Sequence, residues 1–298
     1  MKQGSNFADW QKQVQTHTEE TLTRLLPPAG QLPAPLIEAM RYAAMDGGKR
    51  LRPMLVLAAA ELGNAVTEAA DYALAAIECI HIYSLVHDDM PEMDNDSLRH
   101  GKPACHIQYT PATALLVGDA LQSMAFSLLS RPTSLDAARQ LQMIQTLAQA
   151  AGCHGMAGGQ AIDLACVGVG LNQAELEHMH QLKTGALIRA AVTLGGLCCQ
   201  NISQQALTAL DHYATHLGLA FQVIDDVLDY EQDSSILGKT AGKDAQTNKP
   251  TYVSLMGLDT ARQYAENLVQ QAIDALSDFD QRASHLRALA QFVVARNH

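Results

Sequence analysis

Strand signals are scarce along this chain, and this scarcity restricts its fold more than any other feature. Only five Phe and one Trp occur among 298 residues, and no segment sustains the alternation of apolar and polar residues that is typical of a strand. Ala, Leu, Gln and Met, which favour helices, dominate instead. The sequence therefore predicts an all-α fold.

Proline and glycine residues divide the chain into predicted helices. The segment Tyr72–His87 is apolar on all sides, which indicates a buried central helix rather than an amphipathic surface helix. The pair Gly158-Gly159 is expected to disturb one of the longer helices. The other helices are predicted near 36–46, 53–62, 112–130, 134–166, 173–200, 203–232 and 260–295.

The chain shows no internal boundary. No Gly/Ser linker, charge block or repeat divides it, and a length of 298 residues is close to the limit of a single hydrophobic core. We therefore predict one domain over residues 1–298, in which residues 1–30 form an N-terminal helix and a loop.

Charge and composition exclude several classes of protein. A hydrophobic fraction of 48% excludes disorder, and a net charge of -11 argues against general binding to nucleic acid. The six cysteines contain no CxxC pair and are expected to be reduced thiols. Residues 1–20 lack the apolar core of a signal peptide, and the longest unbroken apolar run is Met54–Ala60. We expect a cytoplasmic protein without a membrane span.

Two acidic clusters carry the strongest chemical signal. One occupies residues 88–96, and the other includes Asp225 and Asp229, which share one face of a helix by their i,i+4 spacing. A solvated acidic surface is the simplest interpretation of one such run. Both clusters, however, follow apolar helix, at Ile80–Val86 and Leu219–Ile224. This placement favours a site that holds a cation between the carboxylates.

The ligand chemistry of these clusters favours magnesium. Carboxylate oxygens suit Mg²⁺, whereas zinc sites use His or Cys. A calcium-binding loop at 94–96 is rejected, because Leu98 and Arg99 stand where a ligand and the obligatory glycine would be needed. Mg²⁺ held by carboxylates usually keeps coordination positions for substrate phosphates.

Several basic segments could bind such phosphates. The segment Gly47–Pro53 combines flexible backbone with cations at a predicted helix start, and Arg99–Lys102 follows the first acidic cluster. Lys183, Lys239 and Lys249 supply further charge. A single lysine or arginine is usually a solvated surface residue, and the segment lacks the spacing of a Walker loop. Together with two acidic clusters, these cations indicate a diphosphate bridged by Mg²⁺.

Six ordered motifs resemble those of short-chain trans-polyprenyl diphosphate synthases, and most nearly those of the bacterial farnesyl diphosphate synthases. The motifs are GGKRLRP (47–53), ECIHIYSLVHDDMPEMDND (78–96), GGQAIDL (158–164), KTGALIRAA (183–191), FQVIDDVLD (221–229) and LGKTAGKD with KPTY (237–252). The resemblance implies an all-α isoprenoid synthase fold, a helical bundle around a deep central cavity. It also implies a homodimer.

The resemblance assigns roles to individual residues, while it leaves Gln160 and Asp163 without a settled role. The implied Mg²⁺ ligands are Asp88, Asp89, Asp94, Asp225, Asp226 and Asp229, for three ions that Mn²⁺ could replace. The implied catalytic residues are Asp88, Asp89, Asp94, Asp225, Asp226 and Lys183. The implied contacts to isopentenyl diphosphate are Gly48, Lys49, Arg52, His81 and His100, and those around the allylic diphosphate are Arg99, Lys183, Thr184, Gln222, Lys239 and Lys249.

Two of these assignments have alternatives. On spacing alone, His81 could equally be a core histidine. His100 departs from the family pattern, which usually has a second arginine at that position. An imidazole with an ordinary pKa of about 6.5 then replaces a bidentate guanidinium. This exchange is expected to weaken the binding of isopentenyl diphosphate.

The reaction that the resemblance implies is a prenyl transfer. Isopentenyl diphosphate condenses with dimethylallyl diphosphate and then with geranyl diphosphate to give (2E,6E)-farnesyl diphosphate, releasing diphosphate each time. Tyr83, five residues before Asp88, and its small neighbour Ser84 are predicted to set this C15 length by closing the cavity floor. The alternatives are a C20 geranylgeranyl diphosphate synthase, a terpene cyclase and a non-catalytic subunit. Lys49, Arg52 and His81 argue against the cyclase, and the two intact acidic motifs argue against the subunit.

Overall fold

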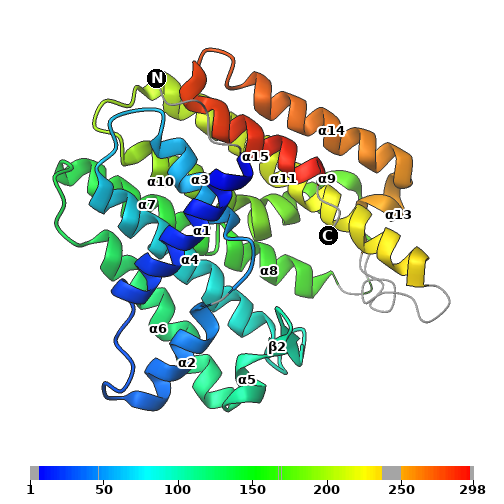
Figure 1. Ribbon diagram of the computed structural model, residues 1–298. Coiled ribbons are helices and arrows are strands. Elements are labelled where there is room, and N and C mark those ends of the chain that lie inside the picture. The colour runs from blue at the N-terminus through cyan, green and yellow to red at the C-terminus, as the bar shows by residue number, and fades with distance from the viewer. Residues whose placement is uncertain (1–6, 46, 167, 169, 237–249, 296–298) are drawn as a thin grey trace.

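The described part of the chain is almost entirely helical (Figure 1), which confirms the all-α prediction. The computed structural model describes residues 7–45, 47–166, 168, 170–236 and 250–295, with only the backbone described for 232–236. The exception to the helical structure is an antiparallel hairpin of two short strands, β1 (Leu98–Arg99) and β2 (Lys102–Pro103). The sequence analysis missed this hairpin. Its turn contains His100 and Gly101, which both have positive φ.

The N-terminal half of the bundle contains six helices among the described residues. They are α1 (Phe7–Leu25), α2 (Ala34–Ala44), α3 (Leu51–Ala60), α4 (Thr67–Asp88), α5 (Cys105–Gln108) and α6 (Pro111–Leu129). Helix α6 begins with Pro111, and the side chain of Thr110 caps it by accepting a hydrogen bond from the Thr113 amide. Figure 1 shows α4 between the other elements of this half, as the apolar segment 72–87 predicted.

The C-terminal half differs from the prediction at two places. The predicted helix over 134–166 is two helices, α7 (Ala137–Ala151) and α8 (Met156–Ala165). The chain turns at 152–155, so the expected disturbance at Gly158-Gly159 is wrong, because both glycines lie inside α8. The predicted helix over 260–295 is α14 (Leu258–Asp274) and α15 (Ser284–Ala295), separated by the short 3-10 helix η2 (Gln281–Ala283).

Local hydrogen bonds explain the break before α15. The Asp280 carboxylate accepts from the Arg282 amide, and Arg287 donates to the carbonyls of Leu276, Phe279 and Asp280. The remaining predictions hold more closely. The segment 173–200 corresponds to α9 (Gln173–His180), the π-helical turn η1 (Gln181–Gly185) and α10 (Ala186–Leu197), and the segment 203–232 corresponds to α11 (Gln204–Ile236). The short helix α13 (Tyr252–Met256) was not predicted.

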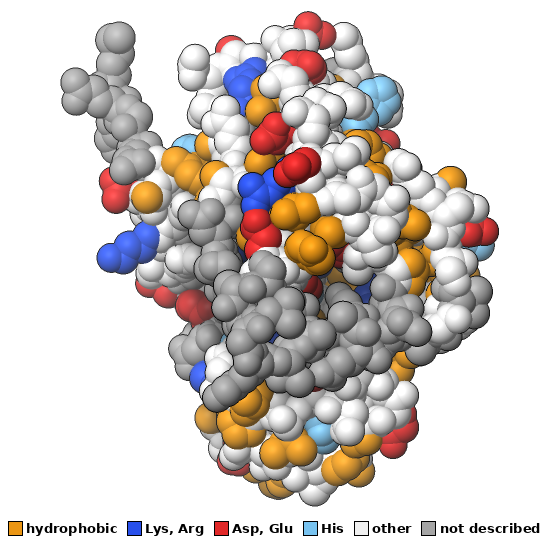
Figure 2. Space-filling model, turned by 90° about the vertical axis from the view of Figure 1, so that its right-hand side faces the viewer, with side chains coloured by type: hydrophobic (Ala, Val, Ile, Leu, Met, Phe, Trp, Pro, Cys, Tyr) orange, Lys and Arg blue, Asp and Glu red, His pale blue; other side chains and the backbone are white. Residues whose placement is uncertain are grey.

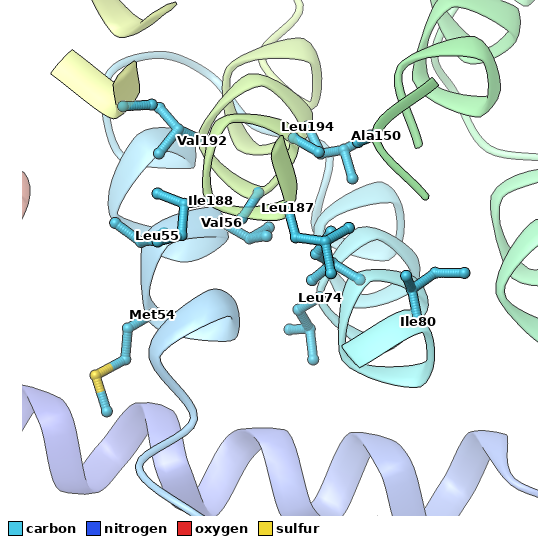
Figure 3. Packing of buried hydrophobic residues seen from close by; sticks show 14 of the residues in the cluster. Met54, Leu55, Val56, Leu74, Ile80, Ala150, Leu187, Ile188, Val192 and Leu194 are labelled. Atoms are coloured by element: carbon cyan, nitrogen blue, oxygen red, sulfur yellow. The ribbon is translucent and has the colours of Figure 1, made fainter. Parts of the chain in front are cut away.

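The hydrophobic core is built where α10 packs on α3 and α4. Figure 3 shows Leu55 and Val56 of α3 close to Ile188 and Leu187 of α10. A Cβ atom at Gly195 would lie 2.1 Å from the Val56 carbonyl oxygen, so α10 approaches α3 as closely as only glycine permits. The buried apolar side chains form one continuous cluster that extends from α1 to α15.

Two described helices, α4 and α6, are long and apolar enough to cross a membrane by length and composition. Within α4, 72% of the apolar window is buried inside the protein, whereas within α6 only 39% is buried. Core packing therefore accounts for the apolar sequence of α4, and α6 keeps an exposed apolar face. On the face of the molecule shown in Figure 2, hydrophobic and charged side chains are interspersed.

Candidate active site

The first acidic cluster forms a closed turn at the C-terminal end of α4. The Asp94 amide donates to the Asp88 carbonyl at 2.9 Å, and the Asp96 amide donates to the Asp89 carbonyl at 3.1 Å. Asn95 completes the turn in the left-handed region, with φ of 51°. The two residues Met90 and Pro91 give the turn its length. The turn therefore brings Asp94 back to the end of the helix that carries Asp88.

The adjacent carboxylates of Asp88 and Asp89 have different partners. Asp89 is only 2% exposed and accepts hydrogen bonds from Arg99 Nε at 3.1 and 3.2 Å. Asp88 accepts a hydrogen bond from the Gln160 side chain on α8. Neighbouring residues on a helix point about 100° apart, because a turn takes 3.6 residues. The two carboxylates therefore contact different elements: Asp88 contacts α8, and Asp89 contacts β1.

The environment of Asp88 is suited to a cation. Burial is the main cause that raises the pKa of the Asp88 carboxyl, and the nearby carboxylate of Asp94 raises it further, whereas Lys183 opposes this. A buried carboxylate beside a second one is destabilised when both are ionised, unless positive charge lies between them. Oxygen donors of this kind fit Mg²⁺.

Lys183 reaches this cluster from the π-helical turn η1. Its ammonium group donates to Asp163 of α8 at 2.7 Å, and Thr184 lies next to it on the same turn. The close packing of α8 on η1 depends on Gly159, where a Cβ atom would lie 2.1 Å from the Lys183 amide nitrogen. Turns of π-helix are frequent at functional sites.

Gln160 therefore contacts Asp88, and Asp163 contacts Lys183. The sequence alone left the roles of Gln160 and Asp163 unsettled. Both residues lie in the motif GGQAIDL, but only the packing of α8 identifies the residues that they contact. Both residues belong to the candidate site.

The second acidic cluster lies on α11, where Asp225 and Asp229 share a face one turn beyond Gln222. Asp226 is 9% exposed and accepts a hydrogen bond from the Tyr252 amide at 2.7 Å, which joins α11 to the start of α13. Within the described residues, no group of three or more His, Cys, Asp or Glu side chains is already gathered around a metal position. A bridging ligand would therefore have to complete a metal site between the two clusters.

A cavity of about 410 Å³ lies beside α4, and Asp89, the neighbour of Asp88, is part of its wall. The predicted contacts that line it are Gly48, Lys49, Arg52, His81, Arg99 and His100. Apolar side chains of Ile82, Leu85 and Phe221 also face it. The structure thus brings together residues from four separate segments of the sequence, as a binding site requires.

Arg52 and His81 make this cavity a candidate site for an anion. Arg52 Nε is buried and has no hydrogen-bond partner among the described residues, and burial lowers the pKa of its guanidinium. Burial, followed by the charge of Arg52, also lowers the pKa of His81 well below its usual value. Electropositive surroundings with an unpartnered donor match a diphosphate. His81 lines the cavity, so it is more than a core histidine.

Some predicted residues lie elsewhere. Tyr83 and Ser84 are not part of the wall of this cavity. Ser84 Oγ donates to the His81 carbonyl at 2.7 Å, whereas Tyr83 packs edge-on to His87 at 5.7 Å and is hydrogen-bonded to Gln122 of α6. Tyr83 therefore lies between α4 and α6. Lys239 and Lys249 fall outside the described residues.

The sequence pattern of the family described as Polyprenyl synthetase matches residues 33–291. This chain belongs to the polyprenyl synthetase family. The match spans both acidic clusters and the cavity, and it begins after α1.

Other members of the polyprenyl synthetase family are similar over nearly the whole chain. The farnesyl diphosphate synthase of Haemophilus influenzae is 46% identical over 294 residues, which cover 98% of this chain and 99% of that protein. The geranylgeranyl diphosphate synthase of Cyanophora paradoxa is 41% identical, over 94% of this chain and 93% of that protein. Among these two, the farnesyl enzyme is the more similar.

Solved structures of polyprenyl synthetase family members share the fold. An FPP/GFPP synthase from Zymomonas mobilis has a TM-score of 0.87 and 42% identity, covering 97% of this chain and 99% of that one. A Helicobacter pylori geranyltransferase, complexed with magnesium and isoprenyl diphosphate, has a TM-score of 0.84 and 30% identity, covering 98% and 99%. These likenesses confirm the all-α isoprenoid synthase fold for this chain.

Proposed function

We propose that this chain is a magnesium-dependent (2E,6E)-farnesyl diphosphate synthase. It condenses isopentenyl diphosphate with dimethylallyl diphosphate and then with geranyl diphosphate, and it releases diphosphate at each step. The observation that carries this proposal is the convergence of Lys49, Arg52, His81 and His100 on one cavity, beside the turn that carries Asp88 and Asp89. The similarity to bacterial farnesyl diphosphate synthases supports the same assignment.

The two substrates bind next to each other at the C-terminal end of α4. Lys49, Arg52 and His81 hold the diphosphate of isopentenyl diphosphate in the cavity. The allylic diphosphate lies at Asp88, where Lys183, Thr184 and Gln222 contact it. Lys239 and Lys249, which are predicted to contact it as well, lie outside the described residues. Arg99, paired with Asp89, lies between the two diphosphates. Each substrate is thereby fixed by positive charge at its diphosphate end, which leaves the hydrocarbon ends to meet.

The carboxylates of the two clusters are proposed to hold three Mg²⁺ ions, for which Mn²⁺ can substitute; they are Asp88, Asp89, Asp94, Asp225, Asp226 and Asp229. Asp89 and Asp226 complete the two motifs through their contacts to Arg99 and to the Tyr252 amide. Magnesium, when bound, supplies positive charge to the departing diphosphate. The acidic clusters thus serve a reaction that needs no side-chain nucleophile.

The bond changes follow from this arrangement. The C1–O bond of the allylic substrate breaks, and its electron pair leaves with the diphosphate. The double bond of isopentenyl diphosphate then attacks C1, and the departing diphosphate takes the proton that is lost. Lys183 stabilises the leaving charge from its position beside Asp163. Ile82, Leu85 and Phe221 line the cavity with apolar surface that keeps water from the allylic cation.

The homodimer is proposed to form through the exposed apolar face of α6. Leu115 and Leu116 are 48% and 53% exposed, and the neighbouring Ile107 is 54% exposed. A second copy would bury this face. We also propose that the chain is a single domain, which the continuous hydrophobic cluster supports, and that it is cytoplasmic.

Product analysis tests the proposed function directly. The purified protein, given isopentenyl diphosphate with dimethylallyl or geranyl diphosphate and Mg²⁺, is expected to release mainly a C15 product, read by chromatography after dephosphorylation. A product that is mainly C20 would identify a geranylgeranyl diphosphate synthase instead. The absence of any prenyl product with either primer would contradict the enzymatic assignment and support a non-catalytic subunit.

His100→Arg is expected to lower the KM for isopentenyl diphosphate roughly tenfold at pH 8, the size of one charge-assisted hydrogen bond. Burial, then the charges of Arg99 and Arg50, lowers the pKa of the His100 imidazole from its usual 6.5. Its positive charge is present below that lowered pKa and is lost as the pH rises through it, so the ring is neutral at pH 8. The gain should be smaller at pH 6, where more of the ring is protonated.

Ser97→Arg is the control for this measurement, because Ser97 is exposed and precedes the same hairpin. This variant should leave the KM for isopentenyl diphosphate unchanged. An unchanged KM in His100→Arg at both pH values would show that His100 does not contact the substrate.

A further inference from the structure

Helix α1 contacts the segment that forms one wall of the cavity. The Glu19 carboxylate accepts a hydrogen bond from Arg50 Nε at 2.9 Å and forms an ion pair with the same guanidinium. One turn earlier on α1, Gln15 Nε2 donates to the Lys49 carbonyl at 3.4 Å. Residues four apart lie on the same face of a helix. One face of α1 therefore touches two consecutive residues of the cavity wall.

The contacted segment, Gly47–Arg52, has an unfavourable backbone conformation. Gly48 has φ of 59° and Arg50 has φ of 52°, both in the left-handed region. Such a conformation costs free energy for a residue with a Cβ atom, and it persists only where surrounding contacts determine it. Arg50 has a Cβ atom, so the contacts of its side chain must hold its backbone in this conformation.

The Arg50 side chain is fixed from three helices. It is 5% exposed and donates to Glu78 of α4 at 2.7 Å, to the Ala44 carbonyl of α2 at 2.6 Å and to Glu19 of α1. Lys49 and Arg52 flank this fixed residue, and both line the cavity. The direction of these two cations therefore depends on the anchor at Arg50.

We propose that α1 is part of the isopentenyl diphosphate site, with Gln15 and Glu19 as positioning residues that hold Lys49 and Arg52 in their binding conformation. The match to the family pattern begins at residue 33, so this contribution comes from a helix that precedes the matched region. Figure 1 shows α1 lying across α3 and α4, beside the start of α3. The proposal rests on the proposed function, because it assigns the Gly47–Arg52 segment to that substrate.

Steady-state kinetics on the full chain test the proposal. Glu19→Ala is expected to raise the KM for isopentenyl diphosphate roughly tenfold, the effect of losing a charge-assisted hydrogen bond. Glu19→Gln, which keeps an acceptor oxygen, should raise it less, and Gln15→Ala less still. The KM for the allylic primer and the kcat should stay within about twofold of the unaltered protein, because Lys183 and the acidic clusters have other supports.

Three controls separate positioning from general stability. Glu20→Gln and Gln13→Ala change exposed neighbours on α1, and neither should alter any constant. Arg24→Gln breaks a different anchor of α1, the pair with Asp71, whose atoms lie 2.7 Å apart. If Arg24→Gln raised the KM for isopentenyl diphosphate as much as Glu19→Ala, the effect would reflect loosened docking of α1, and the proposal would be overturned.

Lys49→Ala and Arg52→Ala distinguish the two possible failures. If both raise the KM for isopentenyl diphosphate while Glu19→Ala and Gln15→Ala do not, the cavity assignment stands and the role of α1 is refuted. If neither Lys49→Ala nor Arg52→Ala raises the KM for isopentenyl diphosphate, the assignment of the cavity to this substrate is wrong. A proportional rise in the KM for both substrates in Glu19→Ala would also contradict a specific role.

Discussion

Replacing Asp88 by alanine is expected to lower kcat roughly a thousandfold or more, since even a single lost donor to developing charge costs about a hundred- to a thousandfold. Asp225→Ala should have an effect of the same order. One cluster alone cannot bridge and neutralise a leaving diphosphate, so each variant removes one half of the metal-binding arrangement. Turnover is measured at saturating substrates with Mg²⁺, and circular dichroism should show unchanged helix content.

Glu92→Gln is the matched control for Asp88→Ala, because Glu92 is an exposed acid in the same turn. It should retain turnover within about twofold, as surface substitutions usually do. Activity close to normal in Asp88→Ala or Asp225→Ala, or in the presence of excess EDTA, would refute the two-cluster mechanism.

Tyr83→Ala is expected to change the main product from C15 to C20 or longer. Tyr83 lies five residues before Asp88, about 7.5 Å along the helix at 1.5 Å per residue, so the prenyl tail that hangs from the metal sites should reach its level. Its ring is 8% exposed and fills the contact between α4 and α6 beside His87. Removing the ring creates space there for one more five-carbon unit.

Tyr83→Phe is the control, because it keeps the ring and removes only the hydrogen bond to Gln122. This variant should still make the C15 product, read by chromatography of the dephosphorylated chains. Tyr83 does not line the cavity described above, so the product lengths of these two variants are needed to show whether its ring limits the prenyl chain. If Tyr83→Ala also stops at C15, then Tyr83 only packs between the helices and other residues set the product length.

The sequence indicated which residue types form the candidate site, but not which of these residues contact one another. Asp88 and Asp225 as magnesium ligands, and Lys49 and Arg52 as phosphate contacts, follow from residue type, spacing and the family resemblance, and these roles stay predictions. The division of labour between Asp88 and Asp89 was not found. It depends on where α4 ends and on which elements, α8 or β1, supply a partner to each side.

The missed features have separate physical causes. The hairpin at 98–103 consists of two-residue strands, which are too short for a periodic pattern. The break at 152–155 contains Gly152 and Gly155, but the adjacent pair Gly158-Gly159, which lies inside α8, was the more conspicuous signal in the sequence. The contacts of α1 to Lys49 and Arg50 join residues more than 30 positions apart. Such long-range contacts leave no mark in local composition.

In the proposed function, helix α4 carries residues for three different roles, and this has a consequence for how such an enzyme can diverge. His81 faces the cavity, Asp88 faces α8, and Tyr83 faces α6. Substitutions at positions without shared partners tend to have additive effects. We therefore expect a substitution at Tyr83 to alter the length of the prenyl chain while the affinity for either diphosphate is preserved. New products would then arise by single substitutions in one helix, without an inactive intermediate.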